Sequence, residues 1–276
     1  MGISVIIPVY NSEQWIGQSV TSALNFDVIS EVLIIDDGST DNSSKLLREL
    51  ASSDKRITIL SHPNNQNKGR SASRNLGIQA ATQPWVAFLD ADDYFLSNRF
   101  DDIDLGSQVD GYYGSISSHN ERNIEASGLV TGIRQDVKPE LLYQFLTEQP
   151  NEYFSIVGLT IRREKLLESG LFDEGLDVGE DTDLIWRLSK LIKLHPQNTK
   201  EAIAIRRVHQ SNYQRETSDR AAFYYKWLTE PPYPLSERAQ KRVFYAYQKY
   251  NSSKDNSKLY ERFRYIRWKL SGKRLV

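Results

Sequence analysis

The sequence predicts an α/β protein in which a mostly parallel sheet is flanked by helices and a small helical extension follows at the C-terminus. Over about the first ninety residues, β-branched runs alternate with helix-like segments, an order typical of a parallel sheet with helices on both faces. Carboxylates directly follow two of these runs, at the strand ends where open α/β sheets bind ligands. Residues 238–276 differ from the rest because they are rich in basic and aromatic side chains.

The expected elements follow one another closely. Strands are expected from apolar, β-branched runs at residues 3–9, 31–35, 57–60 and 85–89. Helices are expected where apolar residues recur at helical spacing between these runs, at residues 15–24, 45–50 and 70–81. Further along, residues 175–179 are expected to form a loop before a helix that starts at Glu180 and Asp181.

Three carboxylates within four positions mark the end of the fourth expected strand. Asp90, Asp92 and Asp93 come directly after the buried run that ends in Phe88 and Leu89. Crowded carboxylates repel one another and stay ionised only where positive charge lies between them. A hard divalent cation shared with a phosphate meets this requirement. A helix N-cap or a solvated acidic turn is the alternative, and for an isolated Asp-x-Asp it would be the better explanation.

Four motifs occur in order along the first hundred residues: Val5-Ile6-Ile7-Pro8-Val9-Tyr10-Asn11, Ile34-Ile35-Asp36-Asp37-Gly38-Ser39-Thr40-Asp41, Gly69-Arg70-Ser71-Ala72-Ser73-Arg74-Asn75-Leu76-Gly77 and Phe88-Leu89-Asp90-Ala91-Asp92-Asp93. A fifth motif follows, Gly179-Glu180-Asp181-Thr182-Asp183-Leu184. With these motifs the chain resembles the family 2 glycosyltransferases, inverting enzymes with the GT-A fold that use nucleotide sugars. The resemblance spans roughly residues 1–210 and does not explain the remaining C-terminal residues.

The resemblance implies a nucleotide-binding half at the strand ends. Asp37 is expected to accept the N3–H of uracil, because an ionised carboxylate only accepts hydrogen bonds. Pro8 and Tyr10 are expected to contact the base, with Tyr10 stacking on it. Arg74 is expected to reach the diphosphate or the base, and Asp90 the ribose or the water shell of a metal. The alternatives are a turn-forming Asp at 37 and a helix-surface Arg at 74.

The same resemblance implies a metal site and a catalytic base. Asp92 is expected to bind Mn²⁺ or Mg²⁺, which would bridge the two phosphates and stabilise the leaving nucleoside diphosphate, with His209 as a further contact. Asp181 is expected to be the general base that deprotonates an acceptor hydroxyl, and Glu180 to position the acceptor. A single displacement by that hydroxyl inverts the anomeric centre. The alternatives are a structural histidine at 209 and a plain helix-terminal acid at 181, which the helix dipole also favours.

Composition places the chain among globular proteins. It has 276 residues, 39% of them hydrophobic, and no cysteine, which excludes disulfides and thiolate chemistry. No apolar run approaches the length of a membrane-spanning helix and no signal segment opens the chain, so a cytoplasmic location is expected. We expect a GT-A catalytic domain over residues 1–215, with a nucleotide-binding half (1–100) and an acceptor-binding half (101–215), followed by a helical region over 216–276.

Charge is unevenly distributed along the chain. The net charge is −1, yet residues 238–276 contain twelve Lys or Arg and only two acidic residues. Apolar residues within this basic segment recur at helical spacing. The segment is therefore expected to pack on the catalytic domain or to lie on an anionic membrane surface, which would suit a lipid-linked acceptor; binding to nucleic acid is the least favoured alternative. Residues 230–234, rich in proline, are expected to form the junction before it.

Three other functions fit less well. Processive polysaccharide synthases of the same family carry a Gln-x-x-Arg-Trp segment and membrane spans, whereas this sequence has Arg264 in place of the Gln and no apolar span. A nucleotidyltransferase usually has a Gly-rich loop after its first strand, and here that place holds Val9-Tyr10-Asn11. A non-catalytic nucleotide-sugar-binding or scaffold protein with a decayed site is disfavoured because the acids at 37, 90, 92 and 181 are intact. The prediction is thus an inverting, metal-dependent glycosyltransferase whose partners are a nucleotide-sugar donor, UDP-linked by resemblance alone, and a glycan or lipid-linked acceptor.

Overall fold

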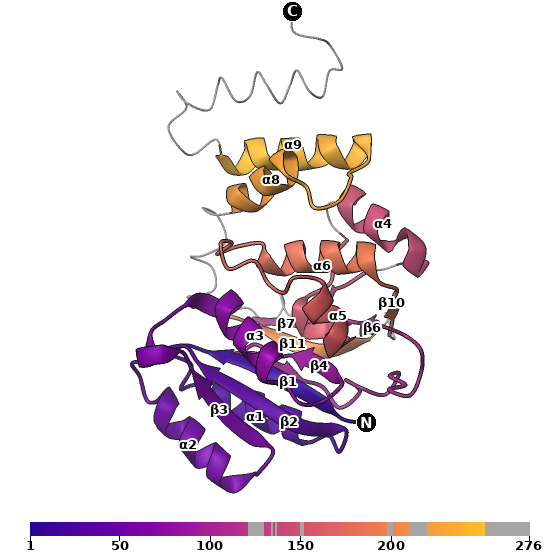
Figure 1. Ribbon diagram of the computed structural model, residues 1–276. Helices are drawn as coiled ribbons and strands as arrows, with labels where there is room; N and C mark the ends of the chain where they lie inside the picture. Colours follow the sequence, from indigo (N-terminus) through magenta and orange to yellow (C-terminus); the bar gives the residue numbers. More distant parts are fainter. Residues whose placement is uncertain are drawn as a thin grey trace, which may run out of the picture.

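The computed structural model describes residues 1–120, 130–133, 135, 137–149, 152–197, 201–209 and 220–251. At its centre is a seven-stranded sheet in the order β10-β6-β9-β4-β1-β2-β3 (Figure 1). The strands are β1 (Ile3–Val9), β2 (Ile29–Asp36), β3 (Ile57–Ser61), β4 (Trp85–Phe88), β6 (Gly111–Tyr113), β9 (Leu159–Arg162) and β10 (Leu194–Pro196). Neighbours run parallel except at β9, which is antiparallel to both β4 and β6. The predicted mostly parallel sheet is therefore confirmed.

Helices cover both faces of this sheet. α1 (Ile16–Leu24) and α2 (Ser43–Ser53) connect β1 to β2 and β2 to β3, whereas α3 (Gly69–Ala80) returns the chain from the edge strand β3 to β4. Because such crossovers are right-handed, outward and returning connections place their helices on opposite faces, and α3 lies in front of the sheet in Figure 1. α3 packs so closely that a Cβ at Gly77 would come within 2.6 Å of Cγ2 of Ile6.

A second, smaller sheet extends from the end of β4. Its order is β5-β11-β7-β8, and its strands are β5 (Tyr94–Phe95), β7 (Ser115–Asn120), β8 (Val130–Thr131) and β11 (Ala202–Val208). β5 follows the acidic cluster at once, and Ile205 of β11 pairs with Tyr94 in antiparallel register. This pairing brings the residues at the end of β11 next to Asp92 and Asp93 although they are more than a hundred positions apart in the sequence.

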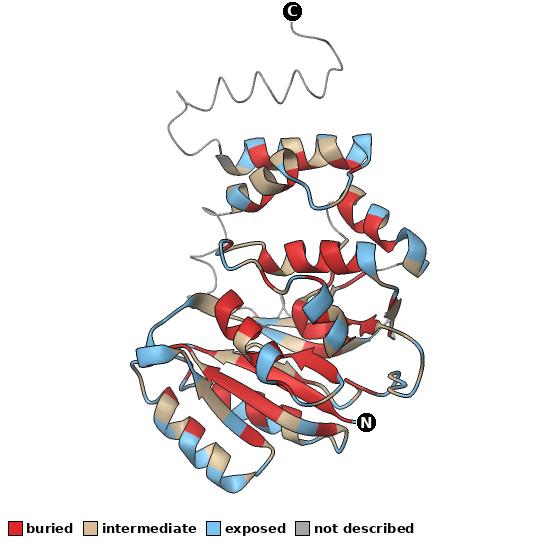
Figure 2. Cartoon of the chain, viewed as in Figure 1, coloured by how far each residue is buried: buried red, intermediate tan, exposed pale blue. Residues whose placement is uncertain are grey.

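Four of the remaining helices lie together at one end of the molecule (Figure 1). They are α4 (Leu142–Glu148), α6 (Glu180–Leu191), α8 (Arg220–Thr229) and α9 (Glu237–Asn251). α5 (Arg163–Glu168) follows β9 and contacts α3, and the short 3₁₀ helices are η1 (Pro63–Asn65), η3 (Pro139–Leu141) and η4 (Ile156–Gly158). Buried residues continue from the central strands through α6 into α8 and α9 (Figure 2). Trp227 of α8 packs edge-to-face on Trp186 of α6, with ring centroids 4.9 Å apart. The two C-terminal helices therefore share one hydrophobic core with the rest.

The helical C-terminal region is present as far as Asn251. Ala239 and Val243 of α9 are fully buried, so for this helix the structure supports packing on the protein. Residues 230–234, expected to form the junction before the basic segment, lie between α8 and α9, and these two helices contact each other. The expected boundary at 215 and the part of the basic segment after residue 251, where apolar residues recur at helical spacing, fall outside the described residues. Within the described part of the chain, no helix has the length and apolar character needed to cross a bilayer.

Candidate active site

The expected nucleotide-binding residues gather at the carboxyl ends of β1, β2 and β4. β1 is the central strand of this group, with β2 on one side and β4 on the other. The order of strands reverses here, since the chain moves outward from β1 to β3 and then returns to β4. Open α/β sheets bind ligands in the crevice outside such a switch point. Tyr10, Asp37 and Asp90 follow β1, β2 and β4 and thus lie at this edge.

A buried guanidinium connects this sheet edge to α6. Arg74 of α3 has no exposed surface, and its two amino groups contact three carboxylates. One donates to Oδ1 of Asp90 at 2.8 Å; the other donates to Oδ1 of Asp181 at 2.7 Å and to Oε1 of Glu180 at 3.3 Å. The Phe172 ring lies against the guanidinium, 5.2 Å from its central carbon. Arg74 was expected to reach the nucleotide; in the structure it holds the acids together, and a contact with the donor stays a prediction.

Two of these acids have pKa values shifted in opposite directions. Burial would raise the pKa of Asp90, but the charge and hydrogen bond of Arg74 hold it below its usual value. For Asp181, burial raises the pKa to about 7 in spite of Arg74, and the neighbouring charges of Glu180 and Asp90 add to the rise. Both carboxylates still reach the solvent, since about a third of each side chain is exposed. Asp181 is thus an accessible carboxyl group that changes protonation near neutral pH, a property suited to a general base.

Glu180 lies deeper than its neighbour. It is 3% exposed and also pairs with Nε of Arg70, at 3.0 Å. Both acids belong to the first turn of α6, which begins after Gly179 in the left-handed conformation (φ 90°), and the helix dipole favours acids there. The expected start of this helix is confirmed. The role of Glu180 in placing an acceptor stays a prediction, because its carboxylate is turned toward the two arginines.

Asp92 and His209 meet on the other side of the acidic cluster. Nε2 of His209 lies 2.8 Å from Oδ2 of Asp92, and the imidazole is stacked on the Trp15 ring with centroids 4.3 Å apart. Arg207 binds the backbone here, donating to the carbonyl oxygen of Asp92 at 2.5 Å. The two residues proposed for a metal are therefore brought together by the pairing of β11 with β5.

The side chains of Asp92 and His209 could bind a divalent cation if the substrate supplies further ligands. Asp92 offers a carboxylate oxygen and His209 a ring nitrogen at a shared point, and both side chains are partly accessible. Among the described residues, no group of three or more His, Cys, Asp or Glu forms a complete cage. Mg²⁺ usually has only one or two carboxylate ligands and completes its shell with waters and substrate phosphates. Two protein ligands are thus compatible with a metal that binds together with a nucleotide diphosphate.

Asp37 stabilises the start of α3 by hydrogen bonds to the backbone. Its carboxylate accepts the backbone N–H of Lys68 at 2.7 Å and of Gly69 at 2.9 Å, and it is 4% exposed. His62 lies beside it, with Nε2 3.6 Å from Oδ1. Tyr10 is 43% exposed at the end of β1, which leaves its ring free to stack, and Pro8 precedes it on the strand. Contacts of these residues with a base stay predictions.

Sequence reasoning did not include three residues that the structure places in the site. Arg70 lies one turn before Arg74 on α3, and spacing of four along a helix could have identified it. His62 follows β3 directly, so the rule for strand ends could have identified it as well. Trp15 had no such signal, because its position in the sequence indicates an ordinary residue at the start of a helix.

Comparison with known sequences establishes the family. The family model described as Glycosyl transferase family 2 matches residues 4–168, more than half of the chain. The chain therefore belongs to glycosyl transferase family 2. It is 30% identical over 199 residues to the minor teichoic acid biosynthesis protein GgaA of Bacillus subtilis, covering 64% of this chain and 41% of GgaA. It is also 32% identical over 126 residues to WfgD of Escherichia coli, a UDP-Glc:alpha-D-GlcNAc-diphosphoundecaprenol beta-1,3-glucosyltransferase, covering 44% of this chain and 48% of WfgD.

Solved structures show the same fold. TarS of S. aureus (residues 1–349) in complex with UDP-GlcNAc superposes with a TM-score of 0.65 at 18% identity, covering 92% of this chain and 73% of that one. The mannosyltransferase PcManGT from Pyrobaculum calidifontis, in complex with GDP-Man and Mn²⁺, gives a TM-score of 0.61 at 15% identity and covers 89% and 69%. The first curated relatives are longer proteins, of which this chain spans between 28% and 39%.

Proposed function

We propose that this protein is an inverting glycosyltransferase that moves a sugar from a UDP-sugar to a hydroxyl group of a growing glycan. The observation that carries the proposal is the cluster around Arg74. It places Asp90, at the sheet edge expected to bind the donor, and Asp181, a partly exposed carboxyl group, on the same guanidinium. Family membership gives the class of reaction, and this cluster supports Asp181 as the residue that acts on the acceptor.

The proposed reaction is a single displacement. Asp181, once ionised, accepts the proton of the acceptor hydroxyl while that oxygen attacks the anomeric carbon; the bond from this carbon to the diphosphate breaks, and UDP leaves with the bonding electrons. Attack from the side opposite the leaving group inverts the anomeric centre. A pKa near 7 leaves much of Asp181 ionised at neutral pH and able to receive a proton. Arg74 keeps the carboxylate in place through a charge-assisted hydrogen bond.

Asp92 and His209 are proposed to hold Mn²⁺ or Mg²⁺ together with the diphosphate. The bound cation would offset the negative charge that develops on the leaving UDP. The distance of 2.8 Å between the two donor atoms supports this assignment, and a neighbour in fold is bound to Mn²⁺. Asp90 lies two residues away and is free on one side to contact the ribose or the water shell.

Two neighbours support the choice of substrates. TarS binds UDP-GlcNAc in its crystal structure, and we propose that Asp37, at the end of β2, accepts the N3–H of uracil in addition to the backbone N–H groups that it already binds. The names of GgaA and WfgD describe teichoic acid synthesis and transfer to a diphosphoundecaprenol-linked sugar. We therefore propose a bacterial-type polysaccharide or lipid-linked glycan as the acceptor. A non-catalytic scaffold is the rival, and a screen of nucleotide sugars for metal-dependent hydrolysis by the wild-type protein separates the two, because a scaffold gives no turnover.

The first prediction concerns the base. Asp181→Asn keeps the shape of the side chain but cannot take a proton, so we expect turnover to fall by roughly 10²–10⁴ with donor affinity nearly unchanged. Asp177→Asn, an exposed acid in the preceding loop, is the matched control and should keep wild-type turnover. Transfer rates and UDP titration calorimetry measure both quantities. Turnover within a factor of two of wild type in Asp181→Asn would mean that Asp181 is only a helix-terminal acid.

The second prediction concerns the metal. Asp92→Ala removes a ligand shared by the cation and the diphosphate, so the gain in UDP affinity that Mn²⁺ provides should disappear while the melting curve stays cooperative. Asp101→Ala, an exposed acid in the loop after β5, should keep the gain. Titration calorimetry of UDP with and without Mn²⁺ gives the answer. An equal Mn²⁺ effect in wild type and Asp92→Ala would exclude Asp92 as a ligand.

The third prediction concerns location. We propose a cytoplasmic protein that contacts anionic membrane through its basic segment, residues 238–276, which suits a lipid-linked acceptor. Each basic residue near such a surface contributes about 1 kcal/mol, and salt screens the attraction. The full chain should co-sediment with phosphatidylserine-containing vesicles at low salt and be released at high salt, and it should not bind neutral vesicles. If the protein does not sediment with these vesicles at low salt, or if salt does not release it, electrostatic membrane contact through residues 238–276 is excluded.

A further inference from the structure

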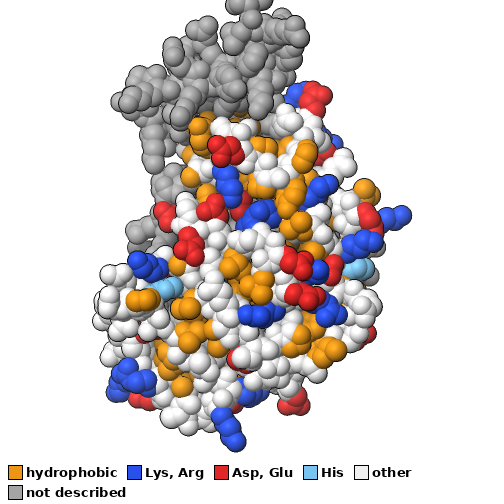
Figure 3. All heavy atoms as spheres, viewed as in Figure 1, with side chains coloured by type: hydrophobic (Ala, Val, Ile, Leu, Met, Phe, Trp, Pro, Cys, Tyr) orange, Lys and Arg blue, Asp and Glu red, His pale blue; other side chains and the backbone are white. Residues whose placement is uncertain are grey.

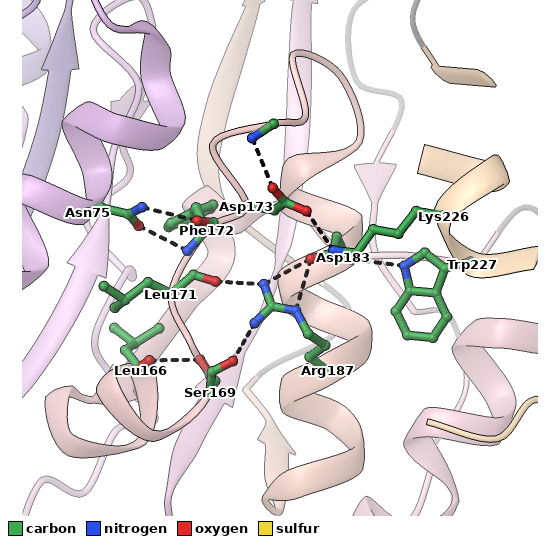
Figure 4. Close-up of polar contacts among 11 residues, drawn as sticks. Asn75, Leu166, Ser169, Leu171, Phe172, Asp173, Asp183, Arg187, Lys226 and Trp227 are labelled. Atoms are coloured by element: carbon green, nitrogen blue, oxygen red, sulfur yellow. Dashed lines mark hydrogen bonds and ion pairs between the residues drawn. The ribbon is translucent and has the colours of Figure 1, made fainter. Parts of the chain in front are cut away.

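A second buried carboxylate on α6 lies on the side of the helix that faces away from Arg74. Asp183 is two residues after Asp181, so on a helix the two side chains point in nearly opposite directions. Asp183 has no exposed surface, and its carboxylate accepts hydrogen bonds from Arg187 on the same helix and from two residues of α8 (Figure 4). Nζ of Lys226 and Nε1 of Trp227 both lie within 2.9 Å of its Oδ1. The start of α6 is thus tied to the C-terminal layer.

The chain that leads into α6 is held by the same network. At Gly170 and Leu171 the backbone is left-handed (φ 83° and 63°), which costs free energy at a leucine. Arg187 stabilises this turn by donating to the carbonyl oxygens of Ser169 and Leu171 at 2.5 and 2.6 Å. Asn75, the neighbour of Arg74 on α3, bonds both the N–H and the carbonyl oxygen of Phe172. The turn is therefore fixed from α3 and α6.

Lys226 adds a third support, from α8. Its ammonium lies 2.8 Å from a carboxylate oxygen of Asp173 and 2.8 Å from one of Asp183. It bridges the two ends of the segment 173–183, which contains Asp181. Phe223, one turn earlier on α8, lies against Gly179, where an added Cβ would come within 2.9 Å of the Phe223 side chain. α8 thus contacts this segment at its beginning, at the start of α6 and at Asp183.

Lys226 lies where it can be replaced without opening the core. It is 27% exposed and borders a surface cavity of about 490 Å³ whose lining also includes Asp173, Glu174 and Arg187. Acidic and basic side chains are interspersed over the outer face of this region (Figure 3). The bridge therefore has a solvent-accessible side, and loss of the ammonium leaves Asp183 with Arg187 and Trp227 as partners.

We propose that Lys226 is a positioning residue for glycosyl transfer: by bridging Asp173 and Asp183 it fixes the segment 173–183 so that Asp181 stays beside Arg74 and Asp90. The inference rests on the proposed function, in which Asp181 is the base. α8 begins after the residues matched by the family model end at 168, so this support comes from the part of the chain that the family match does not cover. In this proposal α8 contributes no group to the reaction itself, but it positions the segment that contains Asp181.

The test compares three variants of the full chain. Lys226→Met keeps the length of the side chain and removes both ion pairs, and we expect kcat to fall by roughly 10- to 100-fold because small displacements of catalytic groups have such effects. The Kd for UDP should stay within a factor of two, because the proposed donor residues lie elsewhere. Lys226→Arg, which can span both carboxylates, should recover most of kcat. Val243→Ala removes buried volume in α9 and should lower the melting temperature but leave kcat unchanged well below it.

A second readout does not depend on activity. Hydrogen exchange of the backbone amides in residues 175–184 should be faster in Lys226→Met than in wild type or Val243→Ala, because the segment loses a support that Val243 does not provide. Wild-type exchange and kcat in Lys226→Met, or an equal loss of kcat in Val243→Ala, would overturn the proposal. If Lys226→Met does not fold, Asp173→Asn removes the 35% exposed end of the bridge, and wild-type exchange in that variant would likewise overturn it. Wild-type protein without turnover on any nucleotide sugar would contradict the proposed function while leaving the exchange result interpretable.

Discussion

The candidate site depends on one buried cation. Arg74 is removed from water, which disfavours its charge, and it remains ionised because three carboxylates surround it. Its planar guanidinium presents donors in two directions at once, so it can bind Asp90 at the end of β4 and Asp181 at the start of α6. A lysine could not span these two positions with the same geometry. The sheet edge and the helix are thereby fixed relative to each other, and the proposed donor and acceptor sides with them.

The same arrangement assigns the two acids different properties. They share a cation, yet the pKa of Asp90 is lowered and that of Asp181 is raised to about 7. Environments that separate the pKa values of neighbouring carboxyl groups are how enzymes assign acid and base roles. Asp90 thus stays ionised as a polar contact, whereas Asp181 exchanges a proton near neutral pH. On the other side of α6, the ion pair of Asp183 with Lys226 connects the first turn of this helix to α8.

Much of this architecture could be read from local sequence, and its long-range contacts could not. The parallel strands and the start of α6 follow from apolar runs and from Gly179-Glu180-Asp181. The antiparallel insertion of β9 between β4 and β6 was not predicted, because its four residues carry no signal of their partners. The burial of Arg74 was missed for a similar reason: its neighbours Ser71, Ser73 and Asn75 resemble a helix surface, but all three are buried. Its pairing with Asp181 spans 107 positions.

The pH dependence of stability in Arg74→Gln tests this account most directly. Without the cation, Asp90 and Asp181 keep their burial and their repulsion by neighbouring carboxylates. The folded-state pKa values of Asp90 and Asp181 therefore rise above the unfolded values, and stability falls as pH increases through that interval. Urea unfolding should therefore show a loss of about 3–5 kcal/mol relative to wild type at pH 8, and a clearly smaller loss at pH 5, where the carboxyl groups can take up protons. Arg70→Gln, whose side chain is 39% exposed, should lose much less at both values. An equal loss at pH 5 and pH 8, or a negligible one at pH 8, would contradict the claim that Arg74 holds these ionised acids together.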